Sequence, residues 1–135
     1  MNKNEVQKIV KYWQATAAHD YKTMISLFES KRYSDSLFFG HIILEKILKG
    51  LVVKNTKEQA PYSHDLVRLQ RLSGIELPEE QLDLLDRVND FNLRARYPEY
   101  KLQFYKLCTK KYTKNYFDKI DLLYKKLCQE LKRKK

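Results

Sequence analysis

Apolar residues recur every three or four positions along most of this chain, the spacing that places them on one face of an α-helix. The pattern predicts long helices over residues 4–30, 34–53, 78–97 and 112–131, and a short helix from about residue 64. The positions that define the first predicted helix are Val6, Ile9, Val10, Trp13, Ala17, Tyr21, Met24, Ile25 and Phe28. No segment keeps the alternation of a β-strand. We therefore expect an all-α fold, an antiparallel up-and-down bundle of about five helices.

Polar and helix-breaking residues mark the ends of these predicted helices. Ser34 is a candidate N-cap of the second helix, and Asn55 lies just beyond its predicted end. Gly74 stops the short helix, because glycine readily adopts the left-handed conformation that ends many helices. Pro98 disfavours helical angles in Tyr97 and therefore ends the fourth helix. A tether of about ten residues then leads to the last helix.

The composition favours a single helical domain over residues 1–135 with a basic C-terminal tail. Only three glycines and three prolines are present, too few for a sheet protein with many turns. No apolar run is long enough to span a membrane, and the polar start of the chain does not resemble a secretory signal. Cys108 and Cys128 lie twenty residues apart, a spacing typical of neither metal sites nor redox motifs. We expect a cytoplasmic protein with reduced thiols, no metal, no cofactor and no membrane contact.

The net charge of +10 is concentrated near the C-terminus. Residues 101–135 contain twelve Lys or Arg and only three Asp or Glu, whereas residues 1–100 are almost neutral. A basic block of this kind favours polyanions such as nucleic acid, or an acidic partner protein. The alternative is a solvated lysine-rich surface that keeps a small protein soluble. The sequence leaves both interpretations open.

The second predicted helix carries two polar residues on its apolar stripe. His41 falls in the middle of an arc of leucines, and Glu45 falls at its edge. His41 is either a core imidazole bonded to a backbone carbonyl or part of a polar seam, inside the bundle or at a dimer interface. Glu45 is either exposed or part of the same seam. The apolar surface of this helix is wider than one neighbour covers, so we expect a homodimer.

Residues 94–98, "RARYP", are the strongest candidate for a binding site. Arg94 and Arg96 offer guanidinium groups suited to phosphate, and Tyr97 or Tyr100 offers a ring on which a base can stack. Lys101 extends the positive charge. These five residues predict a corner that binds the phosphate and base of a nucleotide or of RNA.

Two segments also have a structural interpretation. One arginine of the pair could form an ion pair with Glu45 inside the bundle, with Tyr97 packed against the first helix. In "SHDL", Ser63 can cap the short helix, Asp65 can favour its first turn, and His64 then helps to fix the loop.

Four stretches occur in an order that resembles the HEPN domains (higher eukaryotes and prokaryotes nucleotide-binding) of the small stand-alone bacterial type. They are "YWQATAAHD" at 12–20, "RYSDSLFFGHIILEKILKGLVV" at 32–53, "APYSHDL" at 60–66 and "FNLRARYPEYK" at 91–101. The resemblance implies an up-and-down helical bundle that commonly dimerises. It also implies a minimal nucleotidyltransferase partner in a two-protein module, frequently of toxin–antitoxin type. Many members of the family are metal-independent RNases.

The RNase members share an arginine followed, after four to six residues, by a histidine. No arginine of this chain, including Arg94 and Arg96, has a histidine at that spacing. We therefore expect a module that binds nucleotide or RNA without chemistry of its own. The alternative is a divergent metal-independent RNase in which Arg94 or Arg96 acts with a displaced histidine, His41 or His64.

Overall fold

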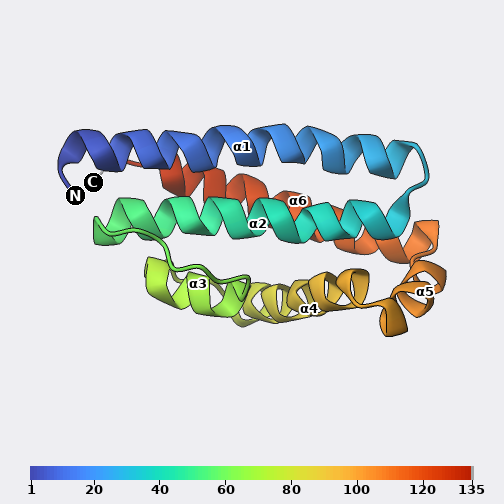
Figure 1. The fold of residues 1–135 in the computed structure, drawn as a ribbon. Helices are drawn as coiled ribbons and strands as arrows, with labels where there is room; N and C mark the ends of the chain where they lie inside the picture. Colours follow the sequence, from blue (N-terminus) through green and yellow to red (C-terminus); the bar gives the residue numbers. More distant parts are fainter. Residues whose placement is uncertain (135) are drawn as a thin grey trace.

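The computed structural model describes residues 1–134, and the last residue of the basic tail, Lys135, lies outside the described part. Six helices follow one another, and the described residues contain no strand. Their bounds are α1 Lys3–Glu29, α2 Tyr33–Thr56, α3 Leu66–Ser73, α4 Glu79–Arg96, α5 Pro98–Leu107 and α6 Lys110–Lys132. The all-α bundle predicted from periodicity is confirmed, and Figure 1 shows the long helices running roughly parallel or antiparallel to one another.

The tether expected after Pro98 is in fact a helix. Pro98 occupies the first turn of α5, where its missing N–H leaves no hydrogen bond unmade. Tyr97 is extended (φ −95°, ψ 126°) and serves both as the C-cap of α4 and as the N-cap of α5. The proline therefore ends one helix and starts the next, and the chain turns at this point (Figure 1).

Three predictions about helix ends are wrong. Ser34 lies inside α2, which starts after Arg32 without a side-chain cap. Asn55 also lies inside α2 and donates from Nδ2 to the carbonyl of Ser73 at 2.8 Å. Asp65, not Ser63, is the N-cap of α3. Gly74 (φ +73°) ends α3 in the left-handed conformation, as predicted.

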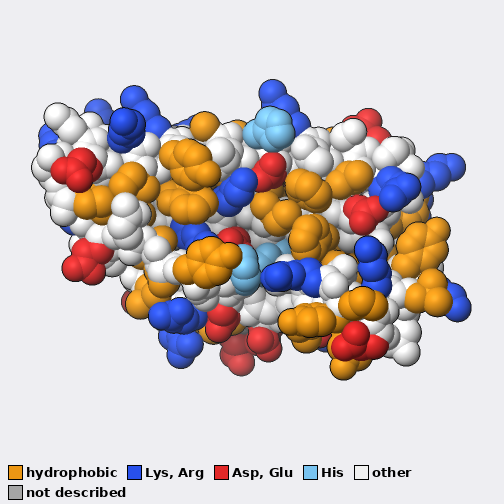
Figure 2. Space-filling model, in the orientation of Figure 1, with side chains coloured by type: hydrophobic (Ala, Val, Ile, Leu, Met, Phe, Trp, Pro, Cys, Tyr) orange, Lys and Arg blue, Asp and Glu red, His pale blue; other side chains and the backbone are white. Residues whose placement is uncertain are grey.

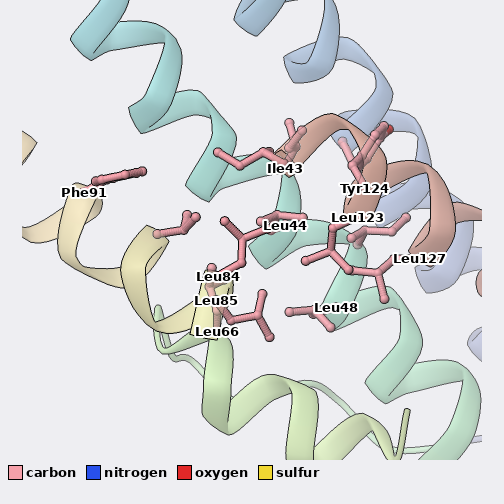
Figure 3. Close-up of a cluster of buried hydrophobic side chains, with 14 of the residues drawn as sticks. Ile43, Leu44, Leu48, Leu66, Leu84, Leu85, Phe91, Leu123, Tyr124 and Leu127 are labelled. Atoms are coloured by element: carbon pink, nitrogen blue, oxygen red, sulfur yellow. The ribbon is translucent and has the colours of Figure 1, made fainter. Parts of the chain in front are cut away.

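Helix α2 is the central element of the bundle. It packs against α1, α6, α3 and α4, and its buried side chains point in all of these directions. Figure 3 shows apolar side chains from α2, α3, α4 and α6 meeting in one core. Gly40 lets α2 pack closely against α6, since a Cβ at this position would lie 2.8 Å from Cδ1 of Ile120. The wide apolar surface of α2 is thus covered within the chain, which removes the reason for which we expected a homodimer.

None of the described helices combines the length and the low charge needed to cross a bilayer. Both cysteines carry free thiols, Cys108 buried and Cys128 half-buried. Burial raises the pKa of Cys108 to about 12 and also raises the pKa of Cys128. The thiols are therefore core groups rather than reactive ones.

Candidate functional site

The end of α4 and the start of α5 carry the five predicted ligand-binding residues, which we call the arginine corner: Arg94, Arg96, Tyr97, Tyr100 and Lys101. All five reach solvent. The residues Tyr97 and Tyr100 are 48% and 45% exposed, so a ligand can reach both side chains from solvent. The structure thus brings the five residues to one turn of the chain.

The two arginines of this corner differ in their partners. Arg94 Nε lies 2.9 Å from Oδ2 of Asp90, one helical turn earlier. Arg96 is exposed and forms no ion pair within the described residues. Its guanidinium group is therefore the one that can accept an anion without first losing a protein partner.

A shallow groove beside Arg96 adds residues that the sequence reasoning did not select. Its lining consists of Arg96, Pro98, Lys101, Leu102 and Tyr105. The last four of these follow the i, i+3, i+4, i+7 spacing of a single helix face. That spacing is present in the sequence, but the prediction of a tether over this segment leaves out Leu102 and Tyr105, which the structure places on α5. Both side chains are well exposed.

Glu45 does not pair with either arginine, which makes that structural interpretation wrong. Its Oε2 accepts from Nζ of Lys49 at 3.0 Å, and its Oε1 accepts from Nδ1 of His64 at 2.7 Å. Lys49 follows Glu45 by one turn of α2, so the partner lies on the same helix. Tyr97, which the same interpretation places against the first helix, is half exposed at the arginine corner.

A second group of polar residues lies between α2 and the loop that precedes α3; we call His41, Glu45, Lys49 and His64 the histidine cluster. Figure 2 shows histidine side chains near the middle of the face it displays, between hydrophobic side chains and Lys or Arg side chains. The side chain of Lys49 is only 7% exposed, and its Nζ lies 5.5 Å from the ring centre of Trp13 and 5.9 Å from that of Tyr62. The cation is thus covered by two aromatic rings.

His41 is 1% exposed and bonds to the backbone of the same loop. Its Nε2 lies 2.8 Å from the carbonyl oxygen of His64, and because a carbonyl can only accept, Nε2 carries the proton. Nδ1 is buried without a hydrogen-bond partner, 3.9 Å from Oε1 of Glu45. Burial lowers the pKa of His41, and the nearby Glu45 only partly opposes this effect. The imidazole is therefore neutral at pH 7 and holds the loop in place.

The start of α3 is fixed by Asp65 and by a residue of α4. Asp65 Oδ1 accepts from the backbone N–H groups of Val67 and Arg68 and from Nδ2 of Asn89. Asn89 Oδ1 in turn accepts from the N–H of Leu66 at 3.0 Å. The sequence analysis did not select Asn89, whose role depends on the packing of α4 beside the start of α3. These contacts hold His64, the residue before Asp65, beside Glu45.

The Glu45–His64 contact can orient an imidazole for proton transfer. The carboxylate accepts from Nδ1 and leaves Nε2 of the partly exposed ring to exchange a proton. No hydrogen bond or ion pair among the described residues joins Arg94 or Arg96 to His41 or His64. Within that same part of the chain, no three His, Cys, Asp or Glu side chains are grouped as a metal site requires.

Comparison with protein families matches residues 10–131 to the model of the HEPN domain. Comparisons with curated proteins and with solved structures find no match. The matched range runs from the first half of α1 to the last turn of α6 and includes both the arginine corner and the histidine cluster. The chain belongs to the HEPN domain family.

Proposed function

We propose that this HEPN protein binds a nucleotide or single-stranded RNA at the arginine corner. The observation that carries the proposal is the exposed, unpaired guanidinium of Arg96 beside the half-exposed rings of Tyr97 and Tyr100. A guanidinium group binds phosphate through two parallel hydrogen bonds, and a tyrosine ring stacks on a base of any sequence. Family membership supports a nucleotide- or RNA-related role.

The proposal includes a protein context. The binding module works as a homodimer with a minimal nucleotidyltransferase, in a two-protein module of toxin–antitoxin type. Exposed leucines on α4 and α5, Leu93, Leu102 and Leu107, supply apolar surface for protein contacts. The free thiols of Cys108 and Cys128 support a location in the reducing cytoplasm. Sedimentation at micromolar concentration tests the dimer, and co-purification with a nucleotidyltransferase encoded in the neighbouring reading frame tests the partner.

Binding of a labelled ten-nucleotide oligoadenylate, measured by fluorescence anisotropy at several salt concentrations, tests the ligand. Replacing Arg96 with Ala should weaken binding about 10-fold or more, the effect of losing a charged hydrogen bond of roughly 1.5–3 kcal/mol. Arg71→Ala, which removes an exposed arginine from α3, is the matched control and should change binding little. Equal effects of the two substitutions would show that only total charge matters.

A second experiment separates base from phosphate. Tyr97→Ala should weaken oligoadenylate by about 1–3 kcal/mol and leave inorganic phosphate binding unchanged, because stacking requires a base. Tyr12→Ala is the control, since Tyr12 is an exposed tyrosine on α1. Absence of salt-dependent binding to RNA, together with absence of nucleotide binding, would refute the proposed function.

A second candidate, a metal-independent RNase, is favoured by the 2.7 Å contact between Glu45 and His64. In this case Nε2 of His64 would remove the proton of the 2′-hydroxyl. Cleavage of RNA that is lost in His64→Ala and retained in His19→Ala would support the enzyme, because His19 is an exposed histidine on α1. Retention of cleavage in both variants would point to a contaminating nuclease.

A further inference from the structure

Residues near both chain termini line a large groove. Figure 1 shows that the termini lie at the end of the bundle opposite α5, and the arginine corner lies where α4 meets α5. Its volume is about 970 Å³. The lining comes from the first half of α1, the end of α2 and the end of α6: Met1, Lys3, Val6, Gln7, Val10, Lys11, Gln14, Lys54, Lys57, Leu131, Arg133 and Lys134. We call this the terminal groove.

The shape of the terminal groove follows from how α1 and α6 pack on α2. The two helices contact each other through Tyr21 and Tyr124, whose stacked rings have centres 4.9 Å apart, and the hydroxyl of Tyr21 donates to Asp121. Nearer the termini, the groove opens between them. The α1 residues that line it, at positions 3, 6, 7, 10, 11 and 14, follow the spacing of one helix face, so a continuous helix surface forms one wall.

The terminal groove combines an aliphatic floor with a positively charged rim. Val6 and Leu131 are nearly buried, and Val10 is partly exposed between them and solvent. Six of the lining residues are Lys or Arg, and none is Asp or Glu. The groove therefore favours a ligand that presents both apolar side chains and negative charge.

The six cations differ in their contacts, and one of them, Arg133, pairs with Glu130 (Nη1 to Oε1, 3.8 Å). Lys54 Nζ donates to the backbone carbonyl of Glu130 at 2.8 Å, and Lys57 Nζ donates to the carbonyl of Lys54 at 2.6 Å. These two lysines help to hold the ends of α2 and α6 in place. Lys3, Lys11 and Lys134 are exposed and form no ion pair within residues 1–134. They are the cations best placed to meet an anionic partner.

We infer that the terminal groove binds an acidic amphipathic helix of a partner protein. Aliphatic side chains on one face of that helix would pack on Val6, Val10 and Leu131, and carboxylates beside them would contact Lys3 and Lys11. RNA fits less well, because no aromatic ring lines the groove and bases would have no surface on which to stack. This inference does not depend on the arginine corner, which lies at the other end of the bundle.

The probe for this site is a synthetic 16-residue helix with leucines at i, i+3, i+4 and i+7 positions and glutamates on either side of them, the spacing that makes an apolar stripe. Its binding is measured by fluorescence anisotropy of the labelled peptide with the full chain at about 0.15 M salt, where exposed charges more than about 8 Å apart are largely screened. Two comparison peptides are used: one with the same composition in scrambled order, and one with glutamine in place of glutamate. We expect each to bind at least roughly tenfold more weakly, since each lacks either the stripe or the charge.

The chain offers a matched pair of double variants. Lys3→Glu with Lys11→Glu should weaken the peptide at least about tenfold, because both cations line the groove. Lys8→Glu with Lys22→Glu changes the net charge by the same amount at two α1 positions that do not line the groove. This pair should weaken binding of the peptide less than about threefold. Arg96→Ala should leave peptide binding unchanged, which separates this site from the arginine corner.

Three results would overturn the inference. Equal binding of the designed and scrambled peptides would indicate charge attraction without a groove. An equal loss of peptide affinity in the two double variants would also indicate charge attraction without a groove. Binding of oligoadenylate that is lost in Lys3→Glu with Lys11→Glu, without binding of the peptide, would identify the groove as an RNA site instead.

Discussion

Replacing Glu45 with Ala should destabilise the fold by about 2–3 kcal/mol, because the change leaves the buried cation of Lys49 without its carboxylate partner. Glu45 is 14% exposed and accepts from Lys49, whose side chain is 7% exposed, and from His64. Among the described residues, Lys49 forms no ion pair other than the one with Glu45, so the substitution leaves its Nζ without a carboxylate. One interpretation of the sequence pairs Glu45 with an arginine, whereas the structure supplies a lysine and a histidine.

The magnitude follows from the surroundings of each partner. Removing one member of a buried ion pair typically costs about 3–5 kcal/mol. The rings of Trp13 and Tyr62 remain over Lys49 in the variant, and each such contact offsets about 0.5–1 kcal/mol. His64 is partly exposed and can bond to water instead. The net loss is therefore smaller than for a fully enclosed pair.

Urea titration followed by helical circular dichroism measures the free energy of unfolding, with Asp118→Ala as the matched control. Asp118 pairs with Lys114 at the same spacing of four residues, but both side chains are 59% exposed, so its loss should cost less than about 0.5 kcal/mol. Adding Lys49→Met to Glu45→Ala should recover much of the stability, because no buried charge then lacks a partner. A loss below about 0.5 kcal/mol for Glu45→Ala, or no recovery in the double variant, would refute the reasoning.

Three further predictions concern other groups. The free energy of unfolding should fall as the pH drops below 6.5, because burial lowers the pKa of His41 in the folded protein and the unfolded chain therefore binds more protons at such pH. Urea unfolding of His41→Gln at several pH values should show a weaker dependence of stability on pH, and a dependence identical to that of the wild type would contradict the prediction. Iodoacetamide at about pH 8, near the ordinary thiol pKa, should modify Cys108 and Cys128 slowly in the native protein, since burial raises both pKa values, and rapidly in denaturant; mass spectrometry that finds fast native labelling would count against it. Gly74→Ala should cost about 1–2 kcal/mol in urea, because its φ is +73°, and Gly74→Asn should cost less; equal stability of all three would be inconsistent with that strain.

The arginine corner was largely predictable from the sequence because its geometry is local. A proline at position 98 prevents helical angles in the residue before it, so Arg94, Arg96 and Tyr97 had to lie at the end of a helix. Leu102 and Tyr105 were predictable in principle from their helical spacing. Their helix, α5, is only ten residues long and starts at a proline, so its apolar positions are too few to distinguish it from a connection by periodicity alone.

The histidine cluster was only half predictable. Periodicity placed His41 in the middle of the buried face of α2 and Glu45 at the edge of that face, and it left open whether Glu45 is exposed. Their partners depend on the path of the loop before α3. This loop returns over α2 and places His64 beside Glu45, although the two residues are 19 positions apart in the sequence. A contact of that kind depends on loop closure and on the bonds from Asn89, neither of which has a sequence period.

The sequence by itself determined the helical class, most helix ends and the corner at Pro98, because these depend on side-chain spacing and on backbone preferences within a few residues. Only the tertiary structure decided that α2 lies at the centre, that Lys49 is the buried partner of Glu45, and that the two ends of the chain together form the terminal groove. These features depend on which helix faces meet. An apolar stripe indicates only that one face of a helix is buried. Packing among all six helices decides which neighbour covers that face.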